Sequence, residues 1–86
     1  RIPFGSLVEL GIIKPGTTIF DNKKKISAKI MADGSIKHAQ TEGSIHKVAA
    51  TILGAESCNG WTYWHYNLDG AVVPIDYLRQ KLISKN

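Results

Sequence analysis

The stretch ISAKIMADGSIKHA, residues 26–39, predicts the central feature of the fold. Residues 26–32 alternate between one face of Ile and Ala and another face of Ser, Lys and Met. Because successive side chains of a strand point to opposite faces, this alternation predicts a strand with one buried side. The dipeptide Asp33-Gly34 favours a two-residue type I′ turn, after which residues 35–39 return as the second strand. The stretch therefore predicts an antiparallel sheet that is covered on one side only.

The stretch GSIHKVAATILG, residues 43–54, carries the clearest helix signal. Ser44 is a favoured N-cap, and Gly54 is a typical helix end. Apolar residues follow at helical spacing and form the expected buried stripe: Ile45, Val48, Ala49, Ile52 and Leu53. The opposite face, expected to be exposed, consists of His46, Lys47, Ala50 and Thr51. The pattern predicts an amphipathic helix.

Shorter segments complete the expected fold, which is of the α+β class. A short helix is predicted over residues 6–11, with Ser6 as its N-cap. Strands are predicted over residues 17–21 and 61–66, and Pro74 is expected in the first turn of a last helix. The buried stripe of that helix is Ile75, Leu78 and Leu82. The order αβββαβα gives a small antiparallel sheet with about three short helices.

The segment CNGWTYWHY, residues 58–66, holds four of the seven aromatic residues in the chain. If it is a strand, Trp61 and Tyr63 point to one face, while Trp64 and Tyr66 point to the other. We expect Trp64 and Tyr66 to lie in the core. Two roles stay open for Trp61, namely packing or stacking on a flat ligand such as a nucleobase, which is worth roughly 1–3 kcal/mol per base.

Length, charge and cysteine content favour one small soluble domain over residues 1–86, taken from a longer protein because the chain does not begin with Met. The net charge of +4 makes a phosphate backbone or another anionic surface a candidate partner, although the same excess is common in domains that bind neither. No apolar run approaches the ~18 residues of a membrane helix, and the single cysteine, Cys58, allows no intramolecular disulfide. The three histidines lack a metal-ligand spacing, so we expect no metal site.

Five blocks of the sequence together resemble a known family. They occur in the order SLVELGIIKPGTTIF, AKIMADGSIK, GSIHKVAATILG, CNGWTYWHY and PIDYLRQK, over nearly the whole chain. This series resembles the RAMA domain, which lies C-terminal to bacterial adenine methylases of the restriction-modification type. The blocks RIPFGSLVELG, GSIHK and CNGWTYWHY most resemble the cell-cycle-regulated adenine DNA methyltransferases of alphaproteobacteria, which methylate GANTC sites.

The resemblance implies a DNA-recognition domain of a larger enzyme. In that family a separate N-terminal domain carries the S-adenosylmethionine site and a DPPY-type catalytic motif, and the C-terminal domain is required for DNA binding. The chain has neither a DPPY-type motif nor a GxG cofactor loop, so we expect no catalysis and no cofactor in this domain alone. The expected partners are DNA (duplex, opened duplex or single strand), the catalytic domain and a second copy of the parent enzyme, in the bacterial cytoplasm at the nucleoid.

The resemblance also implies a set of DNA-contacting residues. They are Ser44 in GSIHK, Asn59 and Trp61 in NGW, and Arg79 in DYLRQK. His46 and Lys47, on the exposed face of the same helix as Ser44, extend the set.

Each of these residues has a purely structural alternative. Ser44 is a good N-cap, Asn59 suits a turn with positive φ, and Arg79 can pair with Asp76 for only ~0.3 kcal/mol. The lysines of the predicted hairpin tip, residues 23–25, are ordinarily solvated, and the resemblance assigns them no role. The competing function is a protein-interaction or dimerisation module that uses the aromatic surface.

Overall fold

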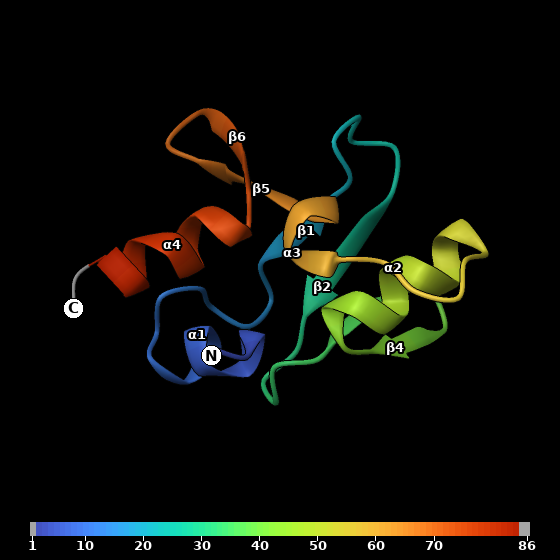
Figure 1. Ribbon diagram of the computed structural model, residues 1–86, viewed down its shortest axis with the longest axis horizontal. Coiled ribbons are helices and arrows are strands. Elements are labelled where there is room, and N and C mark those ends of the chain that lie inside the picture. Colours follow the sequence, from blue (N-terminus) through green and yellow to red (C-terminus); the bar gives the residue numbers. More distant parts are fainter. Residues whose placement is uncertain (1, 85–86) are drawn as a thin grey trace.

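The computed structural model describes residues 2–84 as an α+β fold with a six-stranded antiparallel sheet and helices packed mainly on one side of it (Figure 1). Its elements, in chain order, are α1 (Phe4–Glu9), β1 (Thr18–Phe20), β2 (Ser27–Ile30), β3 (Ile36–His38), β4 (Thr41–Gly43), α2 (Ile45–Leu53), α3 (Gly60–Tyr63), β5 (His65–Leu68), β6 (Ala71–Pro74) and α4 (Asp76–Ser84). The predicted fold class is confirmed. The predicted order of elements is incomplete, because it lacks β4, β6 and α3.

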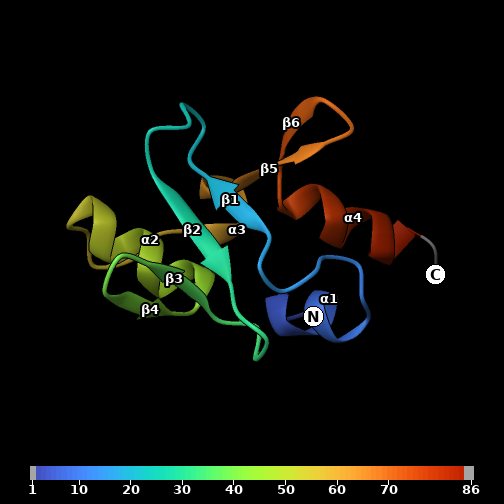
Figure 2. The ribbon, with the colours of Figure 1, turned by 180° about the vertical axis from the view of Figure 1, so that it is seen from behind.

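The sheet consists of a four-stranded meander, β1 to β4, and a two-stranded hairpin, β5 and β6. The strand order is β4-β3-β2-β1-β5-β6, and every neighbouring pair is antiparallel. The long-range pair β1–β5 joins the meander to the hairpin through Phe20 and His65. Helices α2 and α3 lie on one face, and the opposite face of β1, β2 and β3 is open when seen from behind (Figure 2). This confirms a sheet covered on one side.

The alternation predicted for residues 26–32 is confirmed in β2. Ala28 and Ile30 are buried, whereas Ser27 and Lys29 are exposed. The turn after this strand differs from the prediction, however. Gly34 has a φ of +87°, but Asp33 does not have positive φ, so the turn is not type I′.

The reason lies in local bonds and in packing against α1. The Asp33 carboxylate accepts hydrogen bonds from Ser35 Oγ at 2.6 Å and from Ser35 N at 2.9 Å, and the two bonds lower the pKa of this carboxyl group. A side chain on Gly34 would lie 2.7 Å from the Cα atom of Gly5. The type I′ turn occurs instead at Asp69-Gly70, where φ is +52° and +89° and where Leu68 pairs with Ala71.

The segment predicted as a strand over residues 61–66 is divided between a helical turn and a strand. Asn59 caps α3 by accepting a hydrogen bond from Trp61 N at 3.0 Å, and Trp64 then adopts an extended conformation before β5. Asn59 has a φ of −82°, so the expected turn with positive φ is wrong. Because α3 interrupts the alternation, the two faces predicted for this segment are also wrong.

Three helix details differ from the sequence expectations. Helix α1 begins at Phe4 after Pro3, so Ser6 lies inside the helix and does not cap it. In α2, Leu53 is exposed and Ala50 is buried, the reverse of their predicted positions. Pro74 ends the edge strand β6, where the missing N–H is tolerated, and does not open α4.

The core lies between the helices and the covered face of the sheet, and α1 and α4 contribute to it as well as α2 and α3. Trp64 is its largest fully buried side chain, and its indole Nε1–H donates to the carbonyl oxygen of Ile45 at 3.0 Å. Tyr66 is also buried, as expected, and burial raises the pKa of its phenol. Ser44 and Gly54 cap α2 as predicted. Among residues 2–84, no helix has the length and apolar character needed to cross a membrane.

Candidate functional site

A cleft of about 540 Å³ lies where the N-terminal end of α2 meets α3. We call it the α2–α3 cleft, and its lining residues are Ile2, Pro3, Phe4, Gly5, Gly34, Ser44, Ile45, His46, Asn59, Trp61 and Arg79. Five of the six predicted site residues therefore line one cleft. The sixth, Lys47, lines an adjacent hollow that also includes Ser44 and His46.

Close backbone contact between α2 and α3 forms the rear of this cleft. A Cβ atom on Gly60 would lie 2.5 Å from the carbonyl carbon of Ile45, so only glycine fits at this position. Trp64 bonds to the same residue of α2 from beneath. These contacts hold the segment around Asn59 and Trp61 against the first turn of α2.

Two helix caps line the cleft, and each uses a side-chain oxygen. Ser44 Oγ accepts from Lys47 N at 3.0 Å, and Asn59 Oδ1 accepts from Trp61 N at 3.0 Å. Because a backbone N–H can only donate, these bonds fix the orientation of the Asn59 amide group. The Ser44 hydroxyl hydrogen and the Asn59 amide hydrogens stay available, since within residues 2–84 neither group donates a hydrogen bond. Both are exposed residues, so these donors can reach a ligand.

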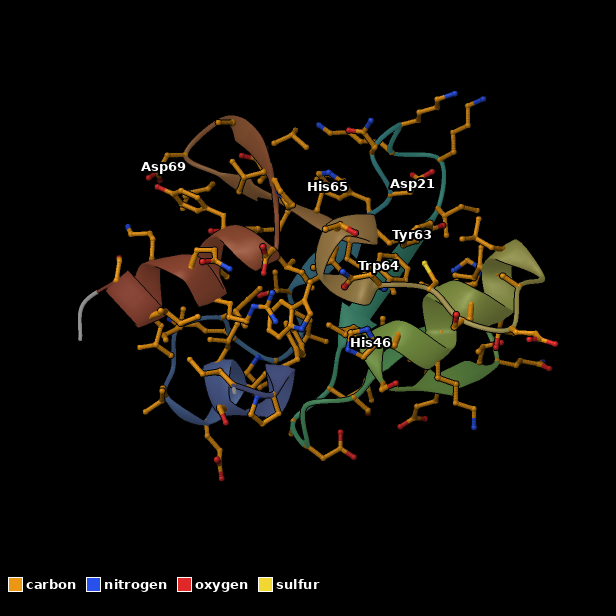
Figure 3. All side chains as sticks on the ribbon, in the orientation of Figure 1. Asp21, His46, Tyr63, Trp64, His65 and Asp69 are labelled. Carbon is orange, nitrogen blue, oxygen red and sulfur yellow. The ribbon has the colours of Figure 1, made fainter. Side chains whose placement is uncertain are left out.

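His46 connects the two helices directly. Its Nδ1 accepts a hydrogen bond from Gly60 N at 2.9 Å, which requires an unprotonated Nδ1. In the neutral ring the proton therefore lies on Nε2, and this second nitrogen is a donor. Figure 3 shows His46 on α2, close to α3. Its firmest observed role is to hold Gly60 in place.

Trp61 forms the floor of the cleft and is packed between two other side chains. Its ring meets Phe4 edge-to-face at 5.9 Å between centroids, and the Arg79 guanidinium carbon lies 4.4 Å from its centroid. Only 5% of Trp61 is exposed, so the freely exposed stacking surface that we considered from the sequence is absent. Within residues 2–84 the indole N–H of Trp61 has no hydrogen-bond acceptor. The bonds in this segment are made by the backbone N–H of Trp61 and by the indole of Trp64.

The Arg79 guanidinium lies over the Trp61 ring, and only some of its N–H groups have partners. Its Nη2 lies 2.6 Å from Asp76 Oδ1, so the ion pair expected as a structural alternative is present. Its Nε is buried and has no hydrogen-bond partner among the described residues. A buried donor without a partner is costly, by about 1–3 kcal/mol, and often marks a site that a ligand completes.

The chemistry of the cleft is therefore that of a hydrogen-bond donor. Its lining includes no carboxylate, and its one formal charge, on Arg79, is paired with Asp76. The free polar hydrogens belong to hydroxyl, amide, imidazole, indole and guanidinium groups, which suit phosphate oxygens or the acceptor edges of bases. Within residues 2–84 no three His, Cys, Asp or Glu side chains are grouped to hold a metal ion.

Sequence reasoning missed the contribution of the N-terminal segment. Phe4 and Gly5 line the cleft together with Gly34, which packs on Gly5. Nothing in the residue pattern links positions so far apart in the chain. The only available signal was the block RIPFG, which belongs to the resemblance but carries no polar residue after its first position.

Comparison with known proteins agrees with the resemblance to the RAMA domain. The chain is similar to the "Type II methyltransferase M.HinfI" of Haemophilus influenzae, with 29% identity over 85 residues. The match covers 99% of this chain but only 24% of that protein, so the chain spans about a quarter of the length of this curated relative. The family described as "Restriction Enzyme Adenine Methylase Associated" matches residues 1–86. The chain therefore belongs to the RAMA family.

Proposed function

We propose that this chain is a DNA-recognition domain of an adenine-specific DNA methyltransferase and helps the parent enzyme to engage GANTC sites. The observation that carries the proposal is the α2–α3 cleft, which collects Ser44, His46, Asn59, Trp61 and Arg79 and presents mainly hydrogen-bond donors. Family membership and the similarity to M.HinfI support the methyltransferase context. In the bacterial cytoplasm the corresponding partner would be nucleoid DNA.

The cleft suits contact with DNA in two ways. The Arg79 guanidinium and the Ser44 hydroxyl at the N-terminal end of α2 can donate to phosphate oxygens, which fixes the position of the domain on DNA. The Asn59 amide can donate to an acceptor on a base edge. With so few groups able to read bases, the domain contributes affinity, and the parent enzyme supplies most of the sequence preference.

Catalysis belongs to the remainder of the parent enzyme in this proposal. We expect S-adenosylmethionine to bind outside this domain, which would then be catalytically silent alone. The alternative, a protein-interaction or dimerisation module, requires an aromatic surface, and Tyr63 alone of the four aromatic residues in the segment is partly exposed: Trp61, Trp64 and Tyr66 are each at least nine-tenths buried. We therefore favour DNA binding over that alternative.

A titration of labelled duplexes with and without a GANTC site tests the proposal. We expect weak binding by the domain alone, with little preference between the duplexes. Arg79→Ala and Lys47→Ala should each lower the log–log slope of affinity against salt by about one unit, because each would remove one phosphate contact. Nanomolar binding that selects GANTC would contradict the supporting role, and an absence of DNA binding would contradict the function.

A further inference from the structure

The open face of the sheet carries a group of lysines that the proposed function has not used. Thr18, Lys29, Lys37 and Glu42 form one row of register partners across β1, β2, β3 and β4. All four residues are exposed. In β1, β2 and β3 the adjacent residues point into the core, whereas β4 is an edge strand of the sheet. This face is turned toward the viewer in Figure 2, with α2 and α3 behind it.

Two of these lysines oppose each other directly. Lys29 and Lys37 are register partners on neighbouring strands and lie on the same exposed face. Like charges in directly opposed positions of a sheet are destabilising. Glu42 is the partner of Lys37 on its other side, and it offsets only one of the two charges. The isolated domain therefore keeps an unfavourable charge pair on a surface where neutral side chains would fit.

A third lysine reaches the same face at some conformational cost. Lys24 has a φ of +59°, a left-handed conformation that favours Gly or Asn. The Asp21 carboxylate holds this loop by accepting hydrogen bonds from Lys25 N at 2.7 Å and Ile26 N at 3.1 Å. The Lys24 Nζ then lies 5.1 Å from the centre of the Phe20 ring, over the open face.

We propose that Lys24, Lys29 and Lys37, here called the lysine face, bind the phosphodiester backbone of DNA as a second contact surface. The proposal rests on the proposed function and extends it to the side of the sheet opposite α2 and α3. Unfavourable local features that persist without a structural gain are expected at functional sites. Here a phosphate chain supplies the missing negative charge, because ammonium groups bind single phosphates as point charges.

The chemistry of the surface favours a polyanion over a protein partner. Protein interfaces have apolar, aromatic centres that are depleted of charged residues. The lysine face is the reverse, with ammonium groups at its centre and the Phe20 ring lying beneath Lys24. Since it carries no group arranged to read bases, its contribution should not depend on DNA sequence. It contacts a segment of DNA other than the one at the α2–α3 cleft, because the two surfaces face different directions.

The test compares two double variants of equal net charge, K24N/K29Q and K14Q/K81Q. Lys14 and Lys81 are exposed lysines outside the lysine face, so the second variant is the matched control. Affinity for a labelled duplex of random sequence is measured over a range of salt concentrations. The log–log slope should fall by about two units in K24N/K29Q and should stay at the wild-type value in K14Q/K81Q.

A melting curve gives the second readout. In K24N/K29Q the melting temperature should not fall, although the salt dependence of DNA binding does. K29Q removes the opposed charge and K24N places Asn in the left-handed conformation, so K24N/K29Q should melt at or above the wild-type temperature although a cation–π contact is lost. Equal salt slopes for the two double variants would overturn the lysine face while leaving the proposed function intact. A wild-type domain that binds no DNA would overturn both.

Discussion

The surroundings of the two tryptophans differ although both side chains are almost fully buried. Trp64 is at 0% exposure, and its indole N–H bonds to Ile45 inside the core. Trp61, at 5% exposure, lies under Arg79 on the floor of the α2–α3 cleft. Within residues 2–84 its N–H has no acceptor, and the Nε of the overlying Arg79 has none either. Burial alone therefore does not distinguish the two surroundings, whereas their position does: Trp64 bonds inside the core and Trp61 lines the cleft.

The largest expected effect is the loss of the core tryptophan. Trp64→Ala removes the most deeply buried ring and should lower the free energy of unfolding by ~3–5 kcal/mol, enough to unfold most of a small domain. A thermal melt followed by circular dichroism measures it. Trp64→Phe keeps an aromatic ring but leaves Ile45 without its indole donor, so it should remain folded with a lower melting temperature. A Trp64→Ala domain as stable as the wild type would contradict the structural role assigned to Trp64 in the core.

Trp61→Ala should be less destabilising than Trp64→Ala, at roughly 2–3 kcal/mol, because the space that it leaves opens into the cleft and can fill with water. If Trp61 only stacked on a base, the domain would stay folded after this change, but its burial favours the packing role that the sequence left open. Trp61→Phe separates the two roles. It keeps a ring between Phe4 and Arg79 and should restore most of the melting temperature.

DNA affinity is the matching measurement for Trp61. If its indole N–H contacts DNA, Trp61→Phe should bind a duplex more weakly than the wild type in spite of near-normal stability. Full DNA affinity in Trp61→Phe would return Trp61 to a packing role like that of Trp64. The same comparison in a full-length parent enzyme should leave S-adenosylmethionine binding unchanged.

Gly60→Ala tests the close backbone contact between α3 and α2, which lies between the Trp61 cleft and the Trp64 core. The new methyl group would lie 2.5 Å from the backbone of Ile45, so α3 must move away from α2. Overpacking of this kind costs about 1–3 kcal/mol. Because Gly54→Ala meets no atom within 4 Å and differs only in the strain of its φ of +67°, it is the control for the crowding at Gly60. Gly60→Ala should reduce DNA affinity as well as stability, whereas Gly54→Ala should reduce stability alone.

Local signals explain which parts of the fold could be predicted. Helix α2 carries its own caps, Ser44 and Gly54, and β2 carries a regular alternation, so both were found. Strands β4 and β6 show no such pattern and exist because neighbouring strands pair with them. Helix α3 is a single turn that depends on the Asn59 cap and on contact with α2, neither of which periodicity reveals.

The candidate site shows the same division between local and long-range information. Motif resemblance supplied its residues, and the structure brings five of the six into one cleft. The sequence could not show that Trp61 is covered by Phe4 from α1 and by Arg79 from α4, because these contacts join the two ends of the chain. Nor could it show that His46 faces Gly60, which is 14 residues away.

The smallest expected effect concerns His46, whose Nδ1 accepts from Gly60 N and whose Nε2 has no hydrogen-bond partner among residues 2–84. His46→Ala leaves Gly60 N without its acceptor and should cost about 1 kcal/mol of stability. In His46→Asn, the side-chain oxygen can occupy nearly the position of Nδ1 and accept from Gly60, but nothing replaces the Nε2–H donor. His46→Asn should therefore melt close to the wild type, and its DNA affinity reports on Nε2 alone. If His46→Asn binds DNA as well as the wild type while His46→Ala binds more weakly, His46 acts by positioning Gly60 and the adjacent Trp61. If both variants lose affinity equally, His46 contacts DNA directly through its Nε2–H group. The cleft then has a hydrogen-bond donor available to DNA, whereas the indole donor of Trp64 is used inside the core.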